Sequence, residues 1–440
     1  MTMLWALSGQ AILSITRFLT SVSVGGRFAP DDRSVSGMGS PEQLGYYSTA
    51  FGVLMLFVAV HEAFVTTPLT VFGQADRSEE RQKTLSGSML VSSLLLIGML
   101  VVGGGLYCAW LMNSQGTNQA ASFAIAAMLL IAPLQLLREF TRRWLLANLE
   151  VRASAILEFL MAIGFVSVLA IVVFNAKMSA TVVFYLIGCV NLLALVGCWV
   201  FYRRRFQFQL ADIKATVNQN FRYGRWVAGE NICSTITMYL CVWLLIGYVS
   251  EEASGVFFAC FTVVLLANPF LLGVCSILAP RAAREYHERG WAGMNRILFQ
   301  YIGLIIGVLV GFSVVLWFFG EPITNLFFGS RYEDFVERQL GGSNLITSTL
   351  GLALPFLGVS FGVTCGLLAI NRPQDSFYSA IIGLVTLVIA NFSFGEISLQ
   401  SAAVSFLVAT VANMTARLCF LILAYKKSMA KTDPQELQKM

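Results

Sequence analysis

The chain has 440 residues, of which 57% are hydrophobic and only 12% are charged, and its net charge is +5. Soluble domains carry roughly 25% charged residues, so this composition indicates a protein that lies in a membrane. The connections between its apolar segments are too short to hold a folded soluble catalytic domain, which excludes enzymes that need one.

Apolar segments of membrane-spanning length follow one another along the chain. A helix that spans a bilayer needs about 20 mostly apolar residues. Segments of this kind cover residues 4–24, 45–72, 85–112, 119–137, 151–174, 180–202, 226–248, 255–279, 297–319, 344–370, 376–395 and 399–425. The sequence therefore predicts an all-α integral membrane protein with about twelve transmembrane helices.

The connections differ strongly in their content of Lys and Arg. Basic residues are concentrated in alternate connections, such as residues 203–225 and 281–296, and they are sparse in the others. Cytoplasmic loops of membrane proteins carry such an excess. With an even number of spans, the pattern predicts that both termini lie in the cytoplasm. Because the basic residues are spread over short loops, no nucleic-acid partner is indicated.

Two halves of the chain repeat one another at an offset of about 220 residues, as the halves of some transporters do. The corresponding residues are Pro133 and Pro355, Leu145 and Leu367, Ser154 and Ser376, Gly9 and Gly229, Gln10 and Glu230, and, more loosely, Gly45 and Gly255. Each half holds an even number of spans, so both halves enter the membrane from the same side. The sequence predicts two parallel six-helix repeats.

This repeat divides the chain into four regions. They are a first six-helix bundle at 1–202, a linker at 203–225, a second six-helix bundle at 226–425 and a cytoplasmic tail at 426–440. In the linker, Phe206, Leu210, Ile213, Val217 and Phe221 recur at the spacing of a helical stripe. The stripe predicts an amphipathic helix on the cytoplasmic surface. A solvated linker is the alternative interpretation.

Several short groups of residues stand at the ends of the predicted helices. They are Gly9, Gln10, 39–47, 65–69, 253–258, Pro280, Phe328, Gly329 and Tyr332. Together they resemble the polysaccharide-transporter branch of the multidrug/oligosaccharidyl-lipid/polysaccharide (MOP) flippase superfamily. The resemblance extends over essentially the whole chain but includes no diagnostic active-site motif. Residues 29–38 depart from it, because they look inserted where that branch has a short turn.

The resemblance implies a V-shaped bundle, with a cavity between two six-helix halves that opens alternately to each side of the membrane. The activity it implies is moving a lipid-linked oligosaccharide, or another exopolysaccharide precursor, across the bacterial inner (plasma) membrane. The implied partners are the lipid-linked glycan, membrane lipids and polysaccharide-synthesis enzymes. No cofactor and no metal are expected.

Charged side chains inside the predicted spans are few, and each costs about 2.5–3.5 kcal/mol to insert. Arg17, in the first span, is the main candidate for binding substrate, because a guanidinium offers several donors to the oxygens of a diphosphate. A structural ion pair, or a side chain that reaches the outer interface, is the alternative. Gln10, Gln135 and Asn231 are candidates for selecting the headgroup of the substrate.

Ionisable residues in other spans are candidates for energy coupling or for the substrate site. His61 and Glu62, in the second span, are candidates for coupling ion binding to transport, and a polar contact between helices is their alternative role. Neighbouring positions of a helix point about 100° apart, so the two side chains are expected to face different surroundings. Glu230 is a candidate substrate-binding residue, because it stands where the first repeat has Gln10. Arg417 is expected to extend to the membrane surface.

Motifs of several enzyme classes are missing. The glycine run at 103–105 lies within a span and is not part of the GxxxxGK[ST] pattern of ATP hydrolysis. His61 and His287 each begin an HExxH pattern, but Val65 and Trp291 occupy its last position, so no zinc peptidase is indicated. The nine cysteines have no regular spacing, which favours neither a disulfide framework nor a metal site.

Three other functions stay open. A drug or cation antiporter of the same superfamily would need acidic residues deep in the helices and would have little need of Arg17. A membrane glycosyltransferase or polymerase would use Asp31 and Asp32 in the first connection, although metal-assisted transfer generally needs a larger scaffold. A non-transporting scaffold for polysaccharide synthesis would tolerate substitution of the charged residues in the spans.

Overall fold

The structure is a computed structural model of the chain. It describes residues 2–27, 39–72, 79–113, 119–148, 150–174, 178–207, 210–329, 332, 335 and 345–429. Three features singled out in the sequence lie outside the described residues: the stretch 29–38 with Asp31 and Asp32, most of the predicted tail, and the side chain of Gln10. The elements within the described ranges are helices.

The chain packs as two compact units. Unit 1 comprises Met1–Leu266 and Ile323–Ser343, and unit 2 comprises Ala267–Pro322 and Asn344–Met440. The division predicted above, with a border at 203–225, is drawn from the duplication of the sequence. It stays a prediction.

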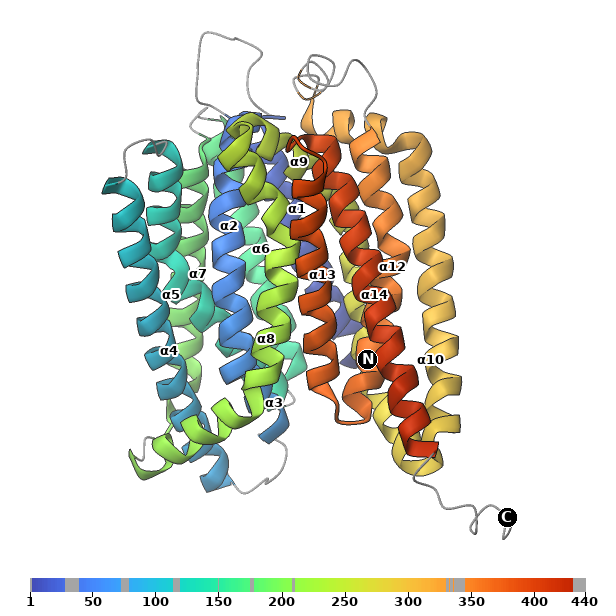
Figure 1. Cartoon of the computed structure of the whole chain (residues 1–440). Helices are drawn as coiled ribbons and strands as arrows, with labels where there is room; N and C mark the ends of the chain where they lie inside the picture. The colour runs from blue at the N-terminus through green and yellow to red at the C-terminus, as the bar shows by residue number, and fades with distance from the viewer. Residues whose placement is uncertain are drawn as a thin grey trace. The chain divides into compact units, whose positions relative to one another are not determined.

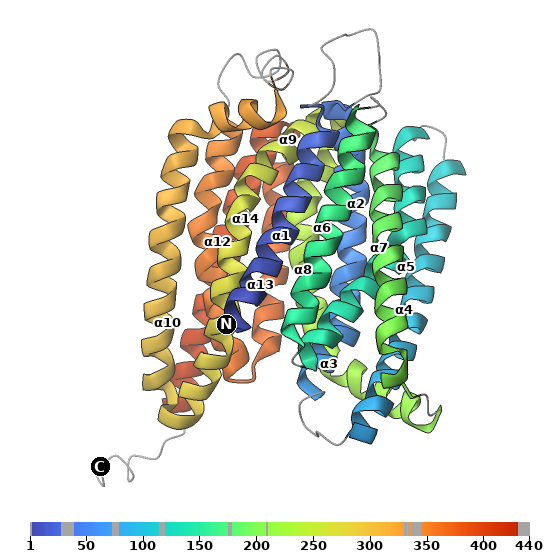
Figure 2. The same ribbon diagram turned by 180° about the vertical axis from the view of Figure 1, so that it is seen from behind.

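Unit 1 is a bundle in which α2 is the most widely connected helix, since it packs against α1, α5, α7, α8 and α9. Figures 1 and 2 show α2, α5 and α7 side by side, with α1 beside α6. The elements of this unit are α1 (Thr2–Val24), α2 (Pro41–His61), the π-helix η1 (Glu62–Thr66), α3 (Thr67–Phe72), α4 (Glu79–Asn113), α5 (Gln119–Ala147), α6 (Val151–Phe174), α7 (Ala180–Tyr202), the 3-10 turn η2 (Arg203–Arg205), α8 (Leu210–Tyr248) and α9 (Glu251–Val264).

Unit 2 begins at Ala267, the last residue of the 3-10 turn η3 (Leu265–Ala267). Its helices are most of α10 (Asn268–Phe328), α12 (Leu345–Ala369), α13 (Pro373–Ser393) and α14 (Leu399–Met429). The α14 helix packs along both α12 and α13. Leu278, Met294 and Leu298 of α10 form a buried core cluster together with Cys365 of α12.

The described helices confirm the predicted fold class. Ten helical stretches are long and apolar enough to cross a membrane, and Ala11–Val24 is a shorter apolar helix. One of the ten, Glu251–Phe328, is 78 residues long. This stretch contains both the eighth and the ninth predicted span. The two spans are separated at Gly290, whose positive φ of 63° interrupts the helix. A membrane imposes helices on such a chain, since lipid offers no hydrogen bonds to a bare backbone.

Serine residues mark the starts of three helices. Ser40, Ser179 and Ser250 have extended backbones, and each side chain accepts a hydrogen bond from the backbone N–H three residues later. Such caps satisfy donors that have no partner inside the helix. The helices α2, α7 and α9 therefore begin within four residues of the predicted starts at 45, 180 and 255.

The repeat-related glycines Gly45 and Gly255 lie at the crossing of α2 and α9. A Cβ on Gly45 would lie 2.1 Å from the backbone oxygen of Glu251, and a Cβ on Gly255 would lie 1.8 Å from that of Pro41. The two helices therefore touch backbone to backbone, which a side chain at either position would prevent. Glycines allow such close approach of membrane helices.

Two predicted boundaries differ from the structure. The fourth span was predicted to end at residue 137, but α5 continues to Ala147. That prediction is wrong because Arg138 and the arginines that follow it resemble a loop in the sequence, whereas in the helix acidic partners neutralise them. The predicted helix in the linker is confirmed from Leu210 onward, where it is continuous with the seventh span as α8.

Candidate functional site

Five helices of unit 1 surround a pocket. Side chains of α1, α2, α5, α6 and α7 line a volume of about 630 Å³, part of which is open to the outside. Most of its wall is apolar or aromatic. The polar lining residues are Thr16, Arg17, Thr20, Tyr47, Gln135, Arg138, Glu158 and Asn191. An apolar pocket with a few convergent polar groups is typical of a ligand site.

Arg17 is exposed at this pocket and forms no ion pair within the described part of the chain, although Glu158 lines the same pocket. Its guanidinium carbon lies 5.9 Å from the centre of the Phe51 ring, a distance at which a cation and an aromatic ring attract each other. Among the described residues, the guanidinium has no ion pair and no hydrogen bond. The alternative role considered above, a structural ion pair, is thus not found in the described part of the chain. Its donors are available to a ligand.

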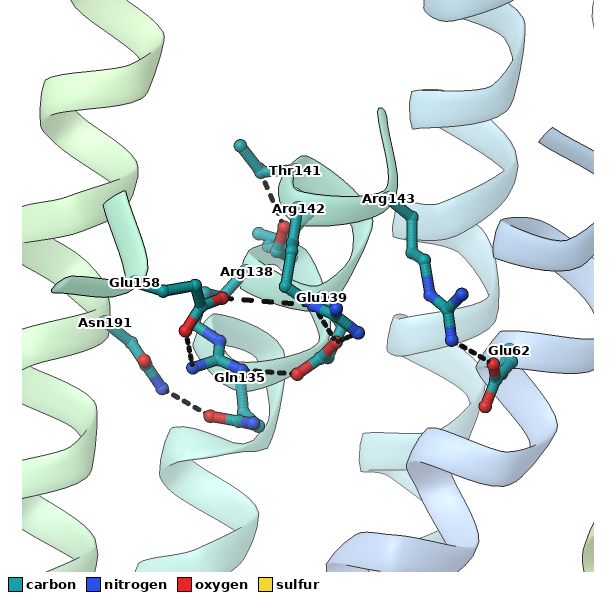
Figure 3. Close-up of polar contacts among 10 residues, drawn as sticks. Glu62, Gln135, Arg138, Glu139, Thr141, Arg142, Arg143, Glu158 and Asn191 are labelled. Carbon is teal, nitrogen blue, oxygen red and sulfur yellow. Dashed lines mark hydrogen bonds and ion pairs between the residues drawn. The ribbon is translucent and has the colours of Figure 1, made fainter. Parts of the chain in front are cut away.

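Four buried charged residues form what we call the α5–α6 charge cluster (Figure 3). Arg138 pairs with Glu139, and Arg142 Nη2 lies 3.0 Å from Glu139 Oε2. Glu158 of α6 lies 3.5 Å from Arg138 and 3.9 Å from Arg142. Each of the four residues is less than one-tenth exposed. Residues 135, 138, 139 and 142 are three or four positions apart, so they lie on one side of α5.

This cluster is neutral but incompletely bonded. Two positive and two negative charges offset one another, as buried charges must. Arg138 Nε and Glu158 Oε1 are nevertheless buried without a hydrogen-bond partner in the described structure. Both residues line the pocket. Together with Arg17, three arginines and two glutamates line or adjoin the pocket, so its surroundings carry one excess positive charge.

Two side-chain amides meet beside the cluster. Asn191 Nδ2 of α7 donates a hydrogen bond of 2.7 Å to Gln135 Oε1 of α5, and both residues line the pocket (Figure 3). Gln135 was predicted as a site residue, whereas Asn191 was missed. The available signal was a lone amide within an otherwise apolar span, which usually faces a partner or a cavity.

His61 and Glu62 lie outside this pocket lining and face different helices. The imidazole of His61 is 1% exposed, and its Nε2 lies 2.7 Å from Ser93 Oγ of α4. Glu62 begins the π-helix η1 and pairs with Arg143 of α5, with both side chains about one-third exposed. The two neighbours thus point in different directions, as expected. Their predicted coupling role stays a prediction.

The other predicted residues are scattered. Glu230 and Asn231 lie on α8, are half-buried and are not among the residues that line the pocket. Arg417 is 5% exposed and donates hydrogen bonds to the Ser360 backbone oxygen at 3.2 Å and to the Thr364 hydroxyl. The prediction that it extends to the membrane surface is wrong, because oxygens of α12 bind it inside unit 2. Within the described ranges, three or more potential metal-ligating side chains do not come together.

Comparisons with known proteins identify the fold. No protein-family model and no curated protein match the sequence. A multidrug resistance MATE family transporter of the MOP superfamily in an inward-facing conformation is similar in structure, with a TM-score of 0.77 and 13% identity over 96% of each chain. An outward-facing MATE transporter gives a TM-score of 0.68 and 14% identity, over 98% of this chain and 95% of that one.

A third solved structure is a MOP superfamily transporter from Pyrococcus furiosus. It gives a TM-score of 0.70 and 13% identity, over 97% of this chain and 94% of that one. That protein is described as having a binding pocket of reversed polarity, which suggests a different function. At these identities the likeness shows a shared fold, that of MATE transporters in the MOP superfamily. It does not show the polysaccharide-transporter branch.

Proposed function

We propose that this protein is a membrane transporter that works by alternating access and carries an amphiphile with an anionic phosphate headgroup. The observation that carries the substrate class is Arg17, a cation at the pocket that forms no ion pair with any described residue. The fold supports the transport mechanism, since similar structures have been solved in inward-facing and outward-facing conformations.

The charge around the pocket supports an anionic substrate. Arg138 and Arg142 are offset by the two glutamates of the charge cluster, so they have little attraction left for a ligand. Arg17 adds a positive charge that forms no ion pair with a described residue, because the two glutamates pair with Arg138 and Arg142. A guanidinium donates several hydrogen bonds in a planar fork that fits phosphate oxygens. Bound phosphate would restore neutrality beside Arg17.

The size of the pocket limits what enters it. The volume of about 630 Å³ includes space that is open to the outside, so the pocket encloses less than that and has no room for a whole sugar chain. The phosphate and the first sugar would therefore occupy the pocket, and the lipid tail would stay outside it. The hydrogen-bonded amides of Gln135 and Asn191 would contact the polar part of the substrate. A lipid-linked oligosaccharide or exopolysaccharide precursor of the bacterial inner membrane has this chemistry.

The second candidate function is a drug or cation antiporter. The likeness to multidrug resistance MATE transporters favours it directly. Glu158 also supports it, because this buried carboxylate lines the pocket with one oxygen lacking a hydrogen-bond donor. In this alternative Glu158 would bind the cation, and Arg17 would have no part in binding. The two candidates therefore assign opposite importance to two residues of the same pocket.

A transport assay separates the candidates. The protein would be reconstituted in liposomes and tested with a lipid-linked oligosaccharide and, separately, with a cationic dye. We expect the wild-type protein to move the lipid-linked substrate. Arg17→Ala should lower the transport rate at least about tenfold, and Arg17→Lys should keep part of the wild-type rate. Dye transport that is lost in Glu158→Gln and kept in Arg17→Ala would establish the antiporter instead. Arg152→Ala, which removes an exposed arginine of α6 that is not among the pocket-lining residues, is the matched control.

A further inference from the structure

We propose that the arginine turn Arg203–Arg205 is a binding site for the phosphate group of an anionic membrane phospholipid, separate from the pocket beside Arg17. The turn η2 follows α7 directly and consists of three consecutive arginines. All three side chains are exposed.

Aromatic residues on both sides hold the arginine turn in place. Tyr202 before it and Phe206 after it pack against a buried core cluster. The members of that cluster are Val65, Leu69, Met89, Phe140, Trp144 and Leu145. The Phe206 ring stacks on Trp144 at 5.0 Å and on Trp199 at 6.0 Å between ring centres. The arginines therefore project from a segment that is anchored at both ends.

The backbone that follows the turn is docked onto α4. The N–H of Gln207 donates to the backbone oxygen of Lys83 at 3.1 Å, although the two residues are far apart in the sequence. A Cβ on Gly87 would lie 1.8 Å from the backbone oxygen of Gln207, so the glycine is what permits this contact. A site whose backbone is already fixed loses less entropy when it binds a ligand.

One of the three arginines of the turn has an acidic partner. Arg205 pairs with Glu150, and its guanidinium lies over the Tyr202 ring at 5.3 Å. Within the described residues, Arg203 and Arg204 have neither an ion pair nor a cation–π contact. Each of these two exposed guanidinium groups can therefore donate charge-assisted hydrogen bonds to an anion at the turn.

An apolar surface directly precedes these charges. Phe201 is 83% exposed, Val200 is 62% exposed and Trp199 is 49% exposed at the end of α7. Tryptophan is enriched where membrane and water meet. An anionic phospholipid offers the matching pair of features, a phosphate for the arginines and an acyl chain for the apolar residues. A soluble phosphate compound would match the arginines alone.

The ordinary explanation of three arginines after a span is that they orient the protein in the membrane. Orientation depends on positive charge, which lysine supplies equally well. It needs neither a docked backbone nor guanidinium geometry. Replacement of arginine by lysine therefore keeps the orientation signal while weakening bidentate contact with phosphate.

The test is lipid retention by the purified full-length protein. Native mass spectrometry would count bound lipids after incubation in micelles containing phosphatidylglycerol or, as the uncharged comparison, phosphatidylcholine. We expect Arg203→Ala/Arg204→Ala to reduce the affinity for phosphatidylglycerol about tenfold, and Arg203→Lys/Arg204→Lys about threefold. The matched control is Arg222→Ala/Arg225→Ala, which removes two exposed arginines of α8 and should change it less than about twofold.

Three outcomes would overturn the proposal. The first is unchanged retention of phosphatidylglycerol in the alanine pair. The second is an equal loss in the alanine pair and in the control, which would indicate general attraction to positive charge. The third applies if the alanine pair does not fold. In that case, retention of phosphatidylglycerol at the wild-type level by the lysine pair would show that binding does not need the guanidinium groups of Arg203 and Arg204. The measurement is independent of transport, so it stands whether or not the proposed function is right.

Discussion

Unit 1 and unit 2 each place an arginine in an apolar helix, and they surround it differently. Arg17 of α1 is exposed at a pocket and meets the face of Phe51, with no ion pair among the described residues. Arg417 of α14 is buried and donates hydrogen bonds to oxygens of Ser360 and Thr364 on α12. The two arginines look alike in the sequence, each a lone cation in an apolar segment.

This difference separates a structural charge from one that is available for function. The hydrogen bonds of Arg417 join two helices of unit 2, so removing it should cost stability. Arg17 joins no helices through hydrogen bonds in the described structure, so removing it should cost binding. The α5–α6 charge cluster is a third case, because its arginines and glutamates neutralise one another through ion pairs. Four substitutions test this distinction between structural and available charges, and the expected loss of stability decreases from the first to the fourth.

Glu139→Gln should have the largest effect on stability. Its carboxylate contacts both Arg138 and Arg142, so the substitution leaves two buried arginines with only the more distant Glu158. Breaking a buried pair costs about 3–5 kcal/mol. Thermal unfolding of the purified protein in detergent would measure the loss. A melting curve equal to that of the wild type would show that water reaches the cluster.

Arg417→Ala should be the next most destabilising. It leaves the backbone oxygen of Ser360 and the hydroxyl of Thr364 without this donor in a buried contact, at a cost of about 1–3 kcal/mol. Arg417→Lys keeps a donor and serves as the matched control. The same unfolding assay applies. If the alanine variant is as stable as the lysine variant, the contact between α14 and α12 does not depend on hydrogen bonding.

Glu62→Gln should cost less than about 1 kcal/mol. Its pair with Arg143 leaves both side chains about one-third exposed, so solvent already screens the attraction. A double-mutant cycle with Arg143→Ala would isolate the energy of the pair. A coupling energy of several kcal/mol would contradict the expected screening by solvent and would mean that the Glu62–Arg143 pair behaves like the buried pairs of the α5–α6 charge cluster.

Arg17→Ala should change stability least, by no more than about 0.5 kcal/mol, as is usual for an exposed residue without specific partners. Transport of the anionic substrate should fall sharply in the same protein sample. Measuring unfolding and transport together distinguishes the two roles. A stability loss comparable to that of Arg417→Ala would make Arg17 a structural residue and would remove the basis of the proposed substrate.

Glycine contacts were partly predictable from the sequence. The repeat paired Gly45 with Gly255 as equivalent positions, and the structure brings these two positions together where α2 crosses α9. Their contact in space could not be derived from the repeat, because two residues at equivalent positions of a repeat need not touch each other. It depends on which helix faces meet.

The helical fold class and the approximate places of the spanning helices were determined by the sequence alone, because a long apolar segment in lipid must satisfy its backbone hydrogen bonds internally. The end of α5 was not, since arginines at 138, 142 and 143 are typical of a loop until their partners are known. Glu139, the nearest partner of Arg138 and Arg142, is on α5 itself, but Glu158 on α6 and Glu62 at the start of η1 come from other helices. Whether a charge inside a membrane helix is neutralised, hydrogen-bonded or left facing a pocket depends on atoms far away in the chain. Only tertiary packing brings those atoms within reach.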